Sequence, residues 1–290
     1  MIKLNEKSAG IGLVVGCILF GLGSVIVAFL SVGAYAIAFW RLAVAAVIFW
    51  ILTYFSGQLF PRAKLARRYA AISGFFLAFD LALWHESIYA VGPGISTLLN
   101  SLQVFWLSAI GFFWFKERQT KLQIFSLFLA VTGVAMIGSP EFSHNGNALW
   151  GFISGIVSGA CLALSMVYVR KTHEVERTAI YPLMLILSLS GMAALFLPSM
   201  IFDSARFFPK NGTEIELILI YGAVMQCFAW GLIAYAIPML SLSLTGLLLL
   251  SEPIAALIID TVFLHKPIGL IQWCGAFCTL VAIYLGTLKK

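Results

Sequence analysis

The chain has 290 residues, of which 61% are apolar and 10% charged, and its formal net charge is +6. Soluble domains average about 45–50% apolar and roughly 25% charged residues, whereas the mean hydropathy here is +1.00. Because so few charged side chains cannot cover a soluble surface, the composition excludes an ordinary soluble enzyme or binding domain. The basic residues lie in short runs between apolar segments, a pattern that favours membrane topology over nucleic-acid binding.

The sequence predicts ten membrane-spanning helices, because a span needs about 20 apolar residues and ten such segments can be drawn. Glycine, proline or charged residues separate them. The first apolar run is longer than the usual 7–15 residues of a signal peptide, which favours an uncleaved span. In chain order the expected spans are Gly10–Leu30, Ala34–Phe55, Tyr69–Tyr89, Gly94–Phe115, Leu122–Ile137, Leu149–Val169, Ile180–Met200, Ile215–Ile237, Leu242–Leu264 and Ile268–Leu285.

The distribution of basic residues predicts the direction in which the chain crosses the membrane. With a cytoplasmic N-terminus and alternating spans, 14 of the 18 lysines and arginines fall on the cytoplasmic side and three on the outer side. Cytoplasmic loops of membrane proteins carry such an excess of lysine and arginine. We therefore expect a multi-pass protein with both termini in the cytoplasm.

The two halves of the chain show an internal repeat. With a shift of 149 residues, Gln103 aligns with Glu252, and the third and fourth spans align with the eighth and ninth. A Gly-x-x-x-Gly pattern recurs near the start of each half and ends at Gly16 and Gly155. Each half would hold five spans, and this odd number predicts that the halves cross the membrane in opposite directions, as inverted repeats. The expected domains are residues 1–140 and residues 148–290.

Two similar stretches include the fourth span of each half. One runs from Leu98 to Arg118 and contains Glu117; the other runs from Leu247 to Pro267 and contains Glu252-Pro253. Their pattern resembles the signature segments of EamA-type transporters, the ten-helix branch of the drug/metabolite transporter superfamily. The second stretch departs from the family pattern, because His265-Lys266 stands where Gly-Glu is usual.

The resemblance implies an all-α membrane protein built from two inverted five-helix repeats. It also implies a secondary transporter of the bacterial inner (plasma) membrane that exports small metabolites such as amino acids. Alternating access is the expected mechanism, with a substrate site near the middle of the membrane between the repeats. Protons are a candidate coupling ion.

Ionisable residues inside the spans are candidates for function, because each costs about 2.5–3.5 kcal/mol to insert at the bilayer centre. Asp80 and Glu252 fall near the middle of their spans. We expect Arg41 and Glu86 to be structural or gating charges, and a pairing of Arg41 with Asp80 or Glu86 would leave Glu252 without a cation. Glu86 and Asp260 lie near the outer ends of their spans, where a site role and an interfacial role both fit.

Polar and aromatic residues share helical faces with these charges. Asp80 aligns with Trp84 in the third span, and Asn100 with Gln103 in the fourth. Trp84 and Trp230 lie well inside their spans, where contact with a ligand and plain packing both remain open. For Glu252 the structural alternative is a hydrogen bond to backbone freed by Pro253. The expected substrate-binding residues, around one central cavity, are Asp80, Trp84, Asn100, Gln103, Trp230 and Glu252.

The sequence contains no phosphate-binding loop, zinc motif or nucleophile elbow. We therefore expect no enzyme activity, no catalytic residues, no metal and no cofactor. The expected partners are a small-molecule substrate and the lipid bilayer, and no nucleic acid. The alternatives are a membrane-embedded enzyme acting on lipid, a membrane scaffold that transports nothing, and an uptake carrier for a cationic or zwitterionic metabolite.

Overall fold

The structure is a computed structural model that describes residues 6–138, 148–255, 258 and 269–287. Every regular element in these residues is helical, which confirms the predicted all-α class for this part of the chain. Within it, four helical stretches are long and apolar enough to cross a membrane. They are α2 (Ala34–Ser56), α6 (Ala148–Val175), α7 (Ile180–Phe202) and the continuous run Gly212–Met239.

Further described helices coincide with single expected spans. These are α1 (Glu6–Phe29), α5 (Lys121–Gly138) and α12 (Leu270–Thr287). Parts of the expected ninth and tenth spans, with Asp260 and His265-Lys266, lie outside the described residues. The count of ten spans therefore stays a prediction.

The expected fourth span is not one helix. Helix α3 (Lys64–Asn100) kinks at Gly92, whose φ of 83° is available to glycine without steric cost, and then continues to Asn100. Helix α4 (Gln103–Phe113) begins after a two-residue break. The predicted single helix Gly94–Phe115 is therefore wrong, because the chain leaves the α-helical path between Asn100 and Gln103.

Local hydrogen bonds and a close helix contact explain this break. The Ser101 hydroxyl donates back to the Thr97 carbonyl at 2.7 Å, and Leu102 N donates to Leu99 O at 3.2 Å, a tighter turn than an α-helix makes. Gly159 of α6 packs against this turn, where an added Cβ would lie 2.7 Å from the Asn100 carbonyl oxygen.

The second half breaks at the aligned position. Helix α10 (Leu242–Leu249) ends at Leu250, and helical structure resumes over residues 251–255. Pro253 lies in this new first turn, where its missing N–H costs no hydrogen bond, whereas it could not donate to Leu249 in an unbroken helix. The two broken helices pack closely, since an added Cβ on Gly246 would lie 3.0 Å from Val104 Cγ2.

The expected eighth span changes helix type along its length. It contains α8 (Gly212–Ile220), a π-helix labelled η3 (Tyr221–Ala229), α9 (Trp230–Ala236) and a 3₁₀ turn labelled η4 (Ile237–Met239). Long π-helical segments are rare, and π-helical turns occur frequently at functional sites. Tyr221 and Gln226, both fully buried, lie on this segment.

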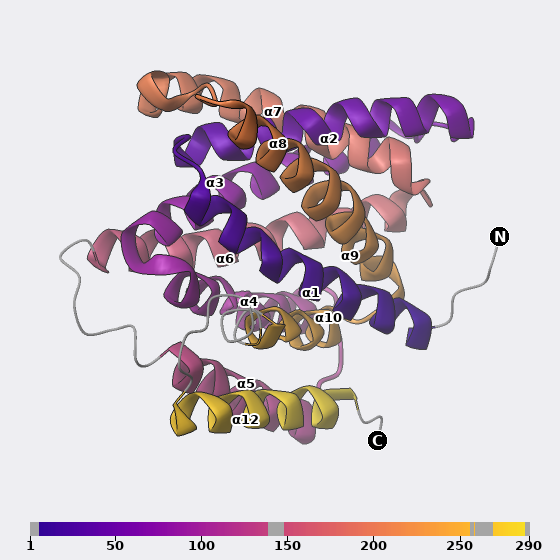
Figure 1. Cartoon of the computed structure of the whole chain (residues 1–290). Helices are drawn as coiled ribbons and strands as arrows, with labels where there is room; N and C mark the ends of the chain where they lie inside the picture. Colours follow the sequence, from indigo (N-terminus) through magenta and orange to yellow (C-terminus); the bar gives the residue numbers. More distant parts are fainter. Residues whose placement is uncertain (1–5, 139–147, 256–257, 259–268, 288–290) are drawn as a thin grey trace.

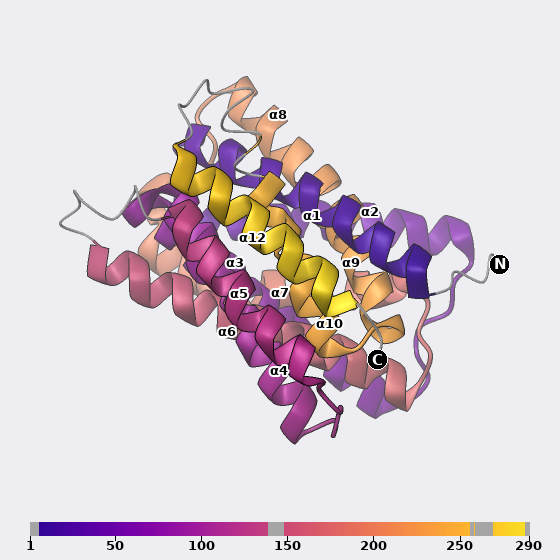
Figure 2. The same cartoon turned by 90° about the horizontal axis from the view of Figure 1, so that it is seen from below.

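Helices from the two halves pack in a regular order. Helix α2 packs on α7, α4 on α10 and α5 on α12. The α5–α12 pair lies at the bottom of Figure 1 and faces the viewer in Figure 2. Helix α3 packs on α6, while α1 packs on η3 and α9. Helix α1 begins and α12 ends at the same end of the bundle, on the right of Figure 1.

Candidate functional site

Arg41 of α2 is fully buried, and its polar and aromatic partners come from both halves of the chain. Its Nε donates to Gln226 Oε1 at 2.8 Å, and its Nη1 donates to the Tyr221 hydroxyl at 2.6 Å. Its Cζ lies 4.5 Å from the centre of the Phe20 ring and 4.4 Å from that of Tyr221. The guanidinium is therefore held in one orientation by neutral groups.

A hydrogen-bonded chain continues from Tyr221 to His85 of α3. His85 Nε2 lies 2.9 Å from the Tyr221 hydroxyl, and Nδ1 lies 3.0 Å from the Ala34 carbonyl oxygen. Since Arg41 donates to the phenol oxygen, the phenol proton is free to bond His85 Nε2. We assign His85 as neutral with its proton on Nδ1, because the Ala34 carbonyl can only accept.

Asp80 is bound by an amide and not by a cation. Asn100 Nδ2 donates to Asp80 Oδ1 at 2.9 Å and lies 2.9 Å from Ser158 Oγ of α6. The charge of Arg41 attracts Asp80, but no ion pair joins them among the described residues. Glu86 accepts a hydrogen bond from Trp150 Nε1 at 3.1 Å. The pairing of Arg41 with Asp80 or Glu86 that the sequence left open is therefore absent among the described ion pairs.

Glu252 lies in the first turn after the break that follows α10, and it is buried. Arg41 attracts its carboxylate, and Asp80 repels it. No hydrogen bond or ion pair to this carboxylate is present within the described part of the chain. Among those residues, Glu252 is thus a buried carboxyl group that lacks a direct partner.

Several buried polar atoms near these groups have no hydrogen-bond partner. The rings of Trp84 and Trp230 lie on the Phe20 ring, at 6.0 and 6.2 Å between centres. Buried polar atoms are normally paired, so an unpaired group calls for an explanation. The unpartnered atoms in this region are Arg41 Nη2, Trp84 Nε1, Gln103 Oε1, Gln226 Nε2 and Trp230 Nε1.

The structure brings the predicted residues into one region with several others that sequence reasoning missed. Gln103, like Asn100, lies beside α6: a Cβ added to Gly159 of α6 would lie 3.3 Å from Gln103 N. His85, Tyr221 and Phe20 were not predicted, although a buried polar side chain in an apolar span is a usable signal for the first two. We call the following set the central polar cluster: Arg41, Asp80, His85, Asn100, Tyr221, Gln226 and Glu252.

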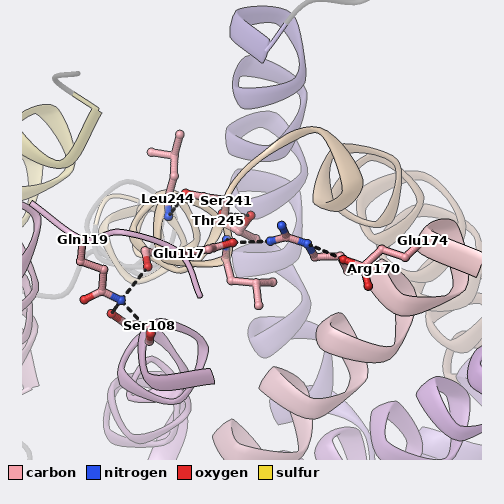
Figure 3. Close-up of polar contacts among 10 residues, drawn as sticks. Ser108, Glu117, Gln119, Arg170, Glu174, Ser241, Leu244 and Thr245 are labelled. Carbon is pink, nitrogen blue, oxygen red and sulfur yellow. Dashed lines mark hydrogen bonds and ion pairs between the residues drawn. The ribbon is translucent and has the colours of Figure 1, made fainter. Parts of the chain in front are cut away.

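One end of the bundle is closed by contacts between the halves, here called the Glu117 end (Figure 3). Glu117, in the link between α4 and α5, accepts hydrogen bonds from Arg170 Nη1 of α6 and, at 3.1 Å, from Leu242 N. Gln119 Nε2 donates to Ser108 Oγ at 2.7 Å and lies 3.1 Å from Ser243 Oγ. The first half thereby holds both α6 and the start of the broken helix α10.

The opposite end, here called the Asp203 end, is closed in a similar way. Asp203 Oδ2 accepts hydrogen bonds from the backbone N–H groups of Tyr35 at 2.8 Å and Ala36 at 3.0 Å, at the start of α2. Glu214 Oε1 accepts from Ser31 Oγ at 2.7 Å. Acidic residues of the second half therefore hold the α1–α2 link at this end, where they complement the exposed N–H groups of a helix start.

Apolar helices that break beside buried polar side chains, with closing contacts at both ends, define a membrane transporter. The sequence profile of the EamA-like transporter family matches residues 7–139 and 149–288, and the chain belongs to this family. The predicted resemblance is thereby confirmed. The protein is a multi-pass membrane transporter of small molecules, and the alternative of a lipid-modifying enzyme is wrong.

Individual relatives agree with this assignment. The chain is 25% identical over 227 residues to "Uncharacterized transporter YetK" of Bacillus subtilis (strain 168), covering 76% of this chain and 67% of that protein. A solved crystal structure has a TM-score of 0.76 over 97% of each chain at 11% identity. At this identity the likeness concerns the fold alone.

Proposed function

We propose that the protein exports small metabolites such as amino acids across the bacterial inner membrane, by alternating access to the central polar cluster. One observation carries the proposal. In each half the fourth helix breaks, and the first turn after the break bears Gln103 in one half and Glu252 in the other. Transporters bind substrates and coupling ions at such discontinuous helices near the middle of the membrane.

The helix packing supports two inverted repeats, at residues 1–140 and 148–290. If the five helices of each half correspond in order, exchanging the halves maps the pairs α2–α7, α4–α10 and α5–α12 onto themselves. The same exchange maps α3–α6 onto the pairing of α1 with η3 and α9. This set of pairs is what a two-fold axis between the halves would produce.

Alternating access assigns a role to the contacts at both ends. The contacts of Glu117 and Gln119 would part to open one side, and those of Asp203 and Glu214 to open the other. The excess of basic residues favours the cytoplasm for the Glu117 end and for both termini. If the two sets of contacts separated alternately, the central polar cluster would be exposed first to one side of the membrane and then to the other.

The proposed substrate-binding residues line the region between the halves. Each is buried within the protein, which suits a ligand site and not a lipid contact. Protons are the proposed coupling ion, because Glu252 lacks a direct partner that would hold its charge. The proposed residues are Asp80, Trp84, Asn100, Gln103, Trp230 and Glu252.

Counterflow in proteoliposomes tests the proposal. Vesicles are loaded with one compound of a metabolite panel at millimolar concentration and supplied with the same compound as a tracer outside. We expect tracer accumulation for at least one amino acid or related metabolite, and loss of it in Glu252→Gln. The matched control is Glu174→Gln, at a half-exposed carboxylate of the Glu117 end. Absence of counterflow for every compound would contradict the proposed function.

Transport in inside-out vesicles gives the direction. Export predicts uptake into inside-out vesicles driven by an imposed proton gradient. The uptake-carrier alternative predicts driven accumulation only in right-side-out vesicles.

A further inference from the structure

We infer that Arg41 and Gln226 form a binding site for an anionic group, most simply a carboxylate, of the transported substrate. The inference rests on the proposed function, since it places this group in the central polar cluster. It changes the expected role of Arg41 from a structural charge to a residue that contacts the substrate.

The guanidinium of Arg41 is fixed but incompletely used. Its Nε is bonded to Gln226 and its Nη1 to Tyr221, so the group cannot turn. Its Nη2 has no partner in the part of the chain that the structure describes, although the side chain is fully buried. A buried cation with a free donor and no ion pair among the described residues is unfavourable in an empty site. An anion at Nη2 would satisfy both the donor and the charge.

Gln226 adds a second donor at the same place. Its Oε1 accepts from Arg41 Nε, which fixes the orientation of the amide, and its Nε2 then has no partner. Gln226 is also fully buried. The amide and the guanidinium therefore both offer free N–H groups beside their shared hydrogen bond, an arrangement suited to the two oxygens of a carboxylate.

The π-helix explains how two side chains of one helix can both bond Arg41. Tyr221 and Gln226 are five residues apart, and in an α-helix they would point about 140° away from each other. The wider turn of η3, with its i→i+5 hydrogen bonds, brings them to one face. Both then bond the same guanidinium. The rare helix type is thus tied directly to the orientation of Arg41.

The surrounding side chains support a ligand of this polarity. Trp84 Nε1 and Trp230 Nε1 are further unpartnered donors, and both rings lie on Phe20, which itself contacts Arg41. No hydrogen bond joins these donors to Asp80, Glu252 or Gln103 among the described residues. The carboxylate of Asp80 is already bonded by Asn100 and is not the missing anion.

The test compares carboxylates with their amides. The purified full-length protein is heated with each of the twenty amino acids and with the corresponding amino-acid amides, which lack the carboxylate. Stabilisation follows RT ln(1 + [L]/Kd), so the shift reports binding. We expect at least one amino acid to raise the melting temperature and its amide to bind at least tenfold more weakly.

Two variants assign the effect to this site. Arg41→Gln removes the charge, and Gln226→Glu places a carboxylate of the same size beside Arg41, where it would occupy the free donors. Each variant should bind the stabilising amino acid at least tenfold more weakly than wild type, whereas Arg68→Gln, at an exposed arginine, should bind it equally well. Gln226→Glu keeps the test valid if Arg41→Gln does not fold.

The outcomes separate this inference from the proposed function. An amide that binds as well as its acid, wild-type affinity in both variants, or no stabilisation by any carboxylate overturns the inference. If counterflow then shows transport of amines or other compounds without a carboxylate, the transport function stands and only the anion site is wrong. If no carboxylate binds, and the single variants Glu252→Gln and Arg41→Gln each destabilise the protein, then Glu252 is the partner of Arg41.

Discussion

At the scale of single residues, the two halves differ in charge at the aligned position that follows each helix break. Gln103 and Glu252 both lie in the first turn after a helix break, yet only Glu252 is ionisable. Gln103 Oε1 has no partner, and Glu252 has no direct one within the described chain. The region thus contains buried acceptors of this kind as well as the free donors of Arg41 and Gln226.

Replacing Glu252 by Gln removes the charge and keeps the shape. We expect normal folding and expression, because a buried carboxylate without a partner contributes no stability. Ligand affinity or transport should fall tenfold or more, since a hydrogen bond to a charged group contributes about 1.5–3 kcal/mol. If Glu252 carries the coupling proton, the pH dependence of flux should disappear; if it binds a substrate ammonium, the pH profile should keep its shape.

Thermal shift and flux across a pH series measure these effects in Glu252→Gln. A variant with wild-type affinity, rate and pH profile would show that Glu252 is structural. Asp80 would then be the principal charged group of the site.

Glu176, in the link between α6 and α7, provides a separate test outside the membrane spans. Its carboxylate accepts hydrogen bonds from the backbone N–H groups of Ala63 at 2.7 Å and Arg62 at 3.0 Å, before α3. These bonds hold the pKa of Glu176 below its ordinary value. Because the pKa is lower in the folded state, the stabilisation is present above the unfolded pKa and is lost as pH falls through the folded pKa.

Glu176→Gln should therefore lower the melting temperature slightly at neutral pH, and the difference from wild type should vanish as the pH falls through the lowered pKa of the folded state. Thermal unfolding in detergent between neutral and acid pH measures this. A difference that grows on acidification would contradict the assigned contact.

At the scale of elements, the contacts of Glu117, here called the latch, join a loop of one half to a broken helix of the other at the Glu117 end. Glu117 bonds Arg170 and Leu242 N, with modest side-chain exposures of 13% for Glu117 and 22% for Arg170. Partly buried contacts of this kind resist screening better than surface pairs. The latch can thus help to hold the two halves together at this end.

Glu117→Gln should weaken the latch, because the amide keeps the shape but loses the charge-assisted bond to Arg170. We expect a thiol placed at Ser243 to react several-fold faster with a soluble maleimide in this variant. The control is Glu174→Gln, which removes only the longer contact to Arg170, at 3.6 Å. Equal reactivity in Glu117→Gln and the control would show that Glu117 does not hold this end closed.

The sequence predicted whole helices better than their interruptions. The expected span Ala34–Phe55 differs by one residue from α2, because a glycine precedes it and another follows it. The break after Asn100 was missed, since residues 98–104 contain no proline or glycine; the residue packed against the break, Gly159 of α6, lies far away in the sequence. The π-helix was missed because its composition is that of an ordinary apolar helix.

Only part of the site was predicted from the sequence, for related reasons. Depth in a span is readable from sequence, so Asp80 and Glu252 could be found. The partner of a charge is not readable, because it depends on how helices pack: Arg41 bonds Gln226 and Tyr221, which lie far away in the sequence, and neither of the carboxylates considered from the sequence. Likewise the bond from Tyr221 to His85 could not be seen before the helices were placed.

At the scale of the whole molecule, orientation follows from charge. The cytoplasmic assignment of the Glu117 end predicts that a single cysteine at Leu65, near the start of α3, is not labelled by an impermeant reagent outside intact cells. A cysteine at Lys210, at the Asp203 end, should be labelled. Both are made in a background without the five native cysteines. Labelling of position 65 from outside would overturn the orientation.

Cross-linking of the two ends tests most directly whether the cluster is reached alternately from both sides. Two cysteine pairs join the halves: Gln119→Cys with Ser243→Cys at one end, where the native side chains lie 3.1 Å apart, and Ser31→Cys with Glu214→Cys at the other, at 2.7 Å. Counterflow is measured in proteoliposomes before and after a short cleavable thiol cross-linker. We predict that closing either end alone stops counterflow and that cleaving the linker restores it. Wild-type counterflow with either end fully cross-linked would contradict the account.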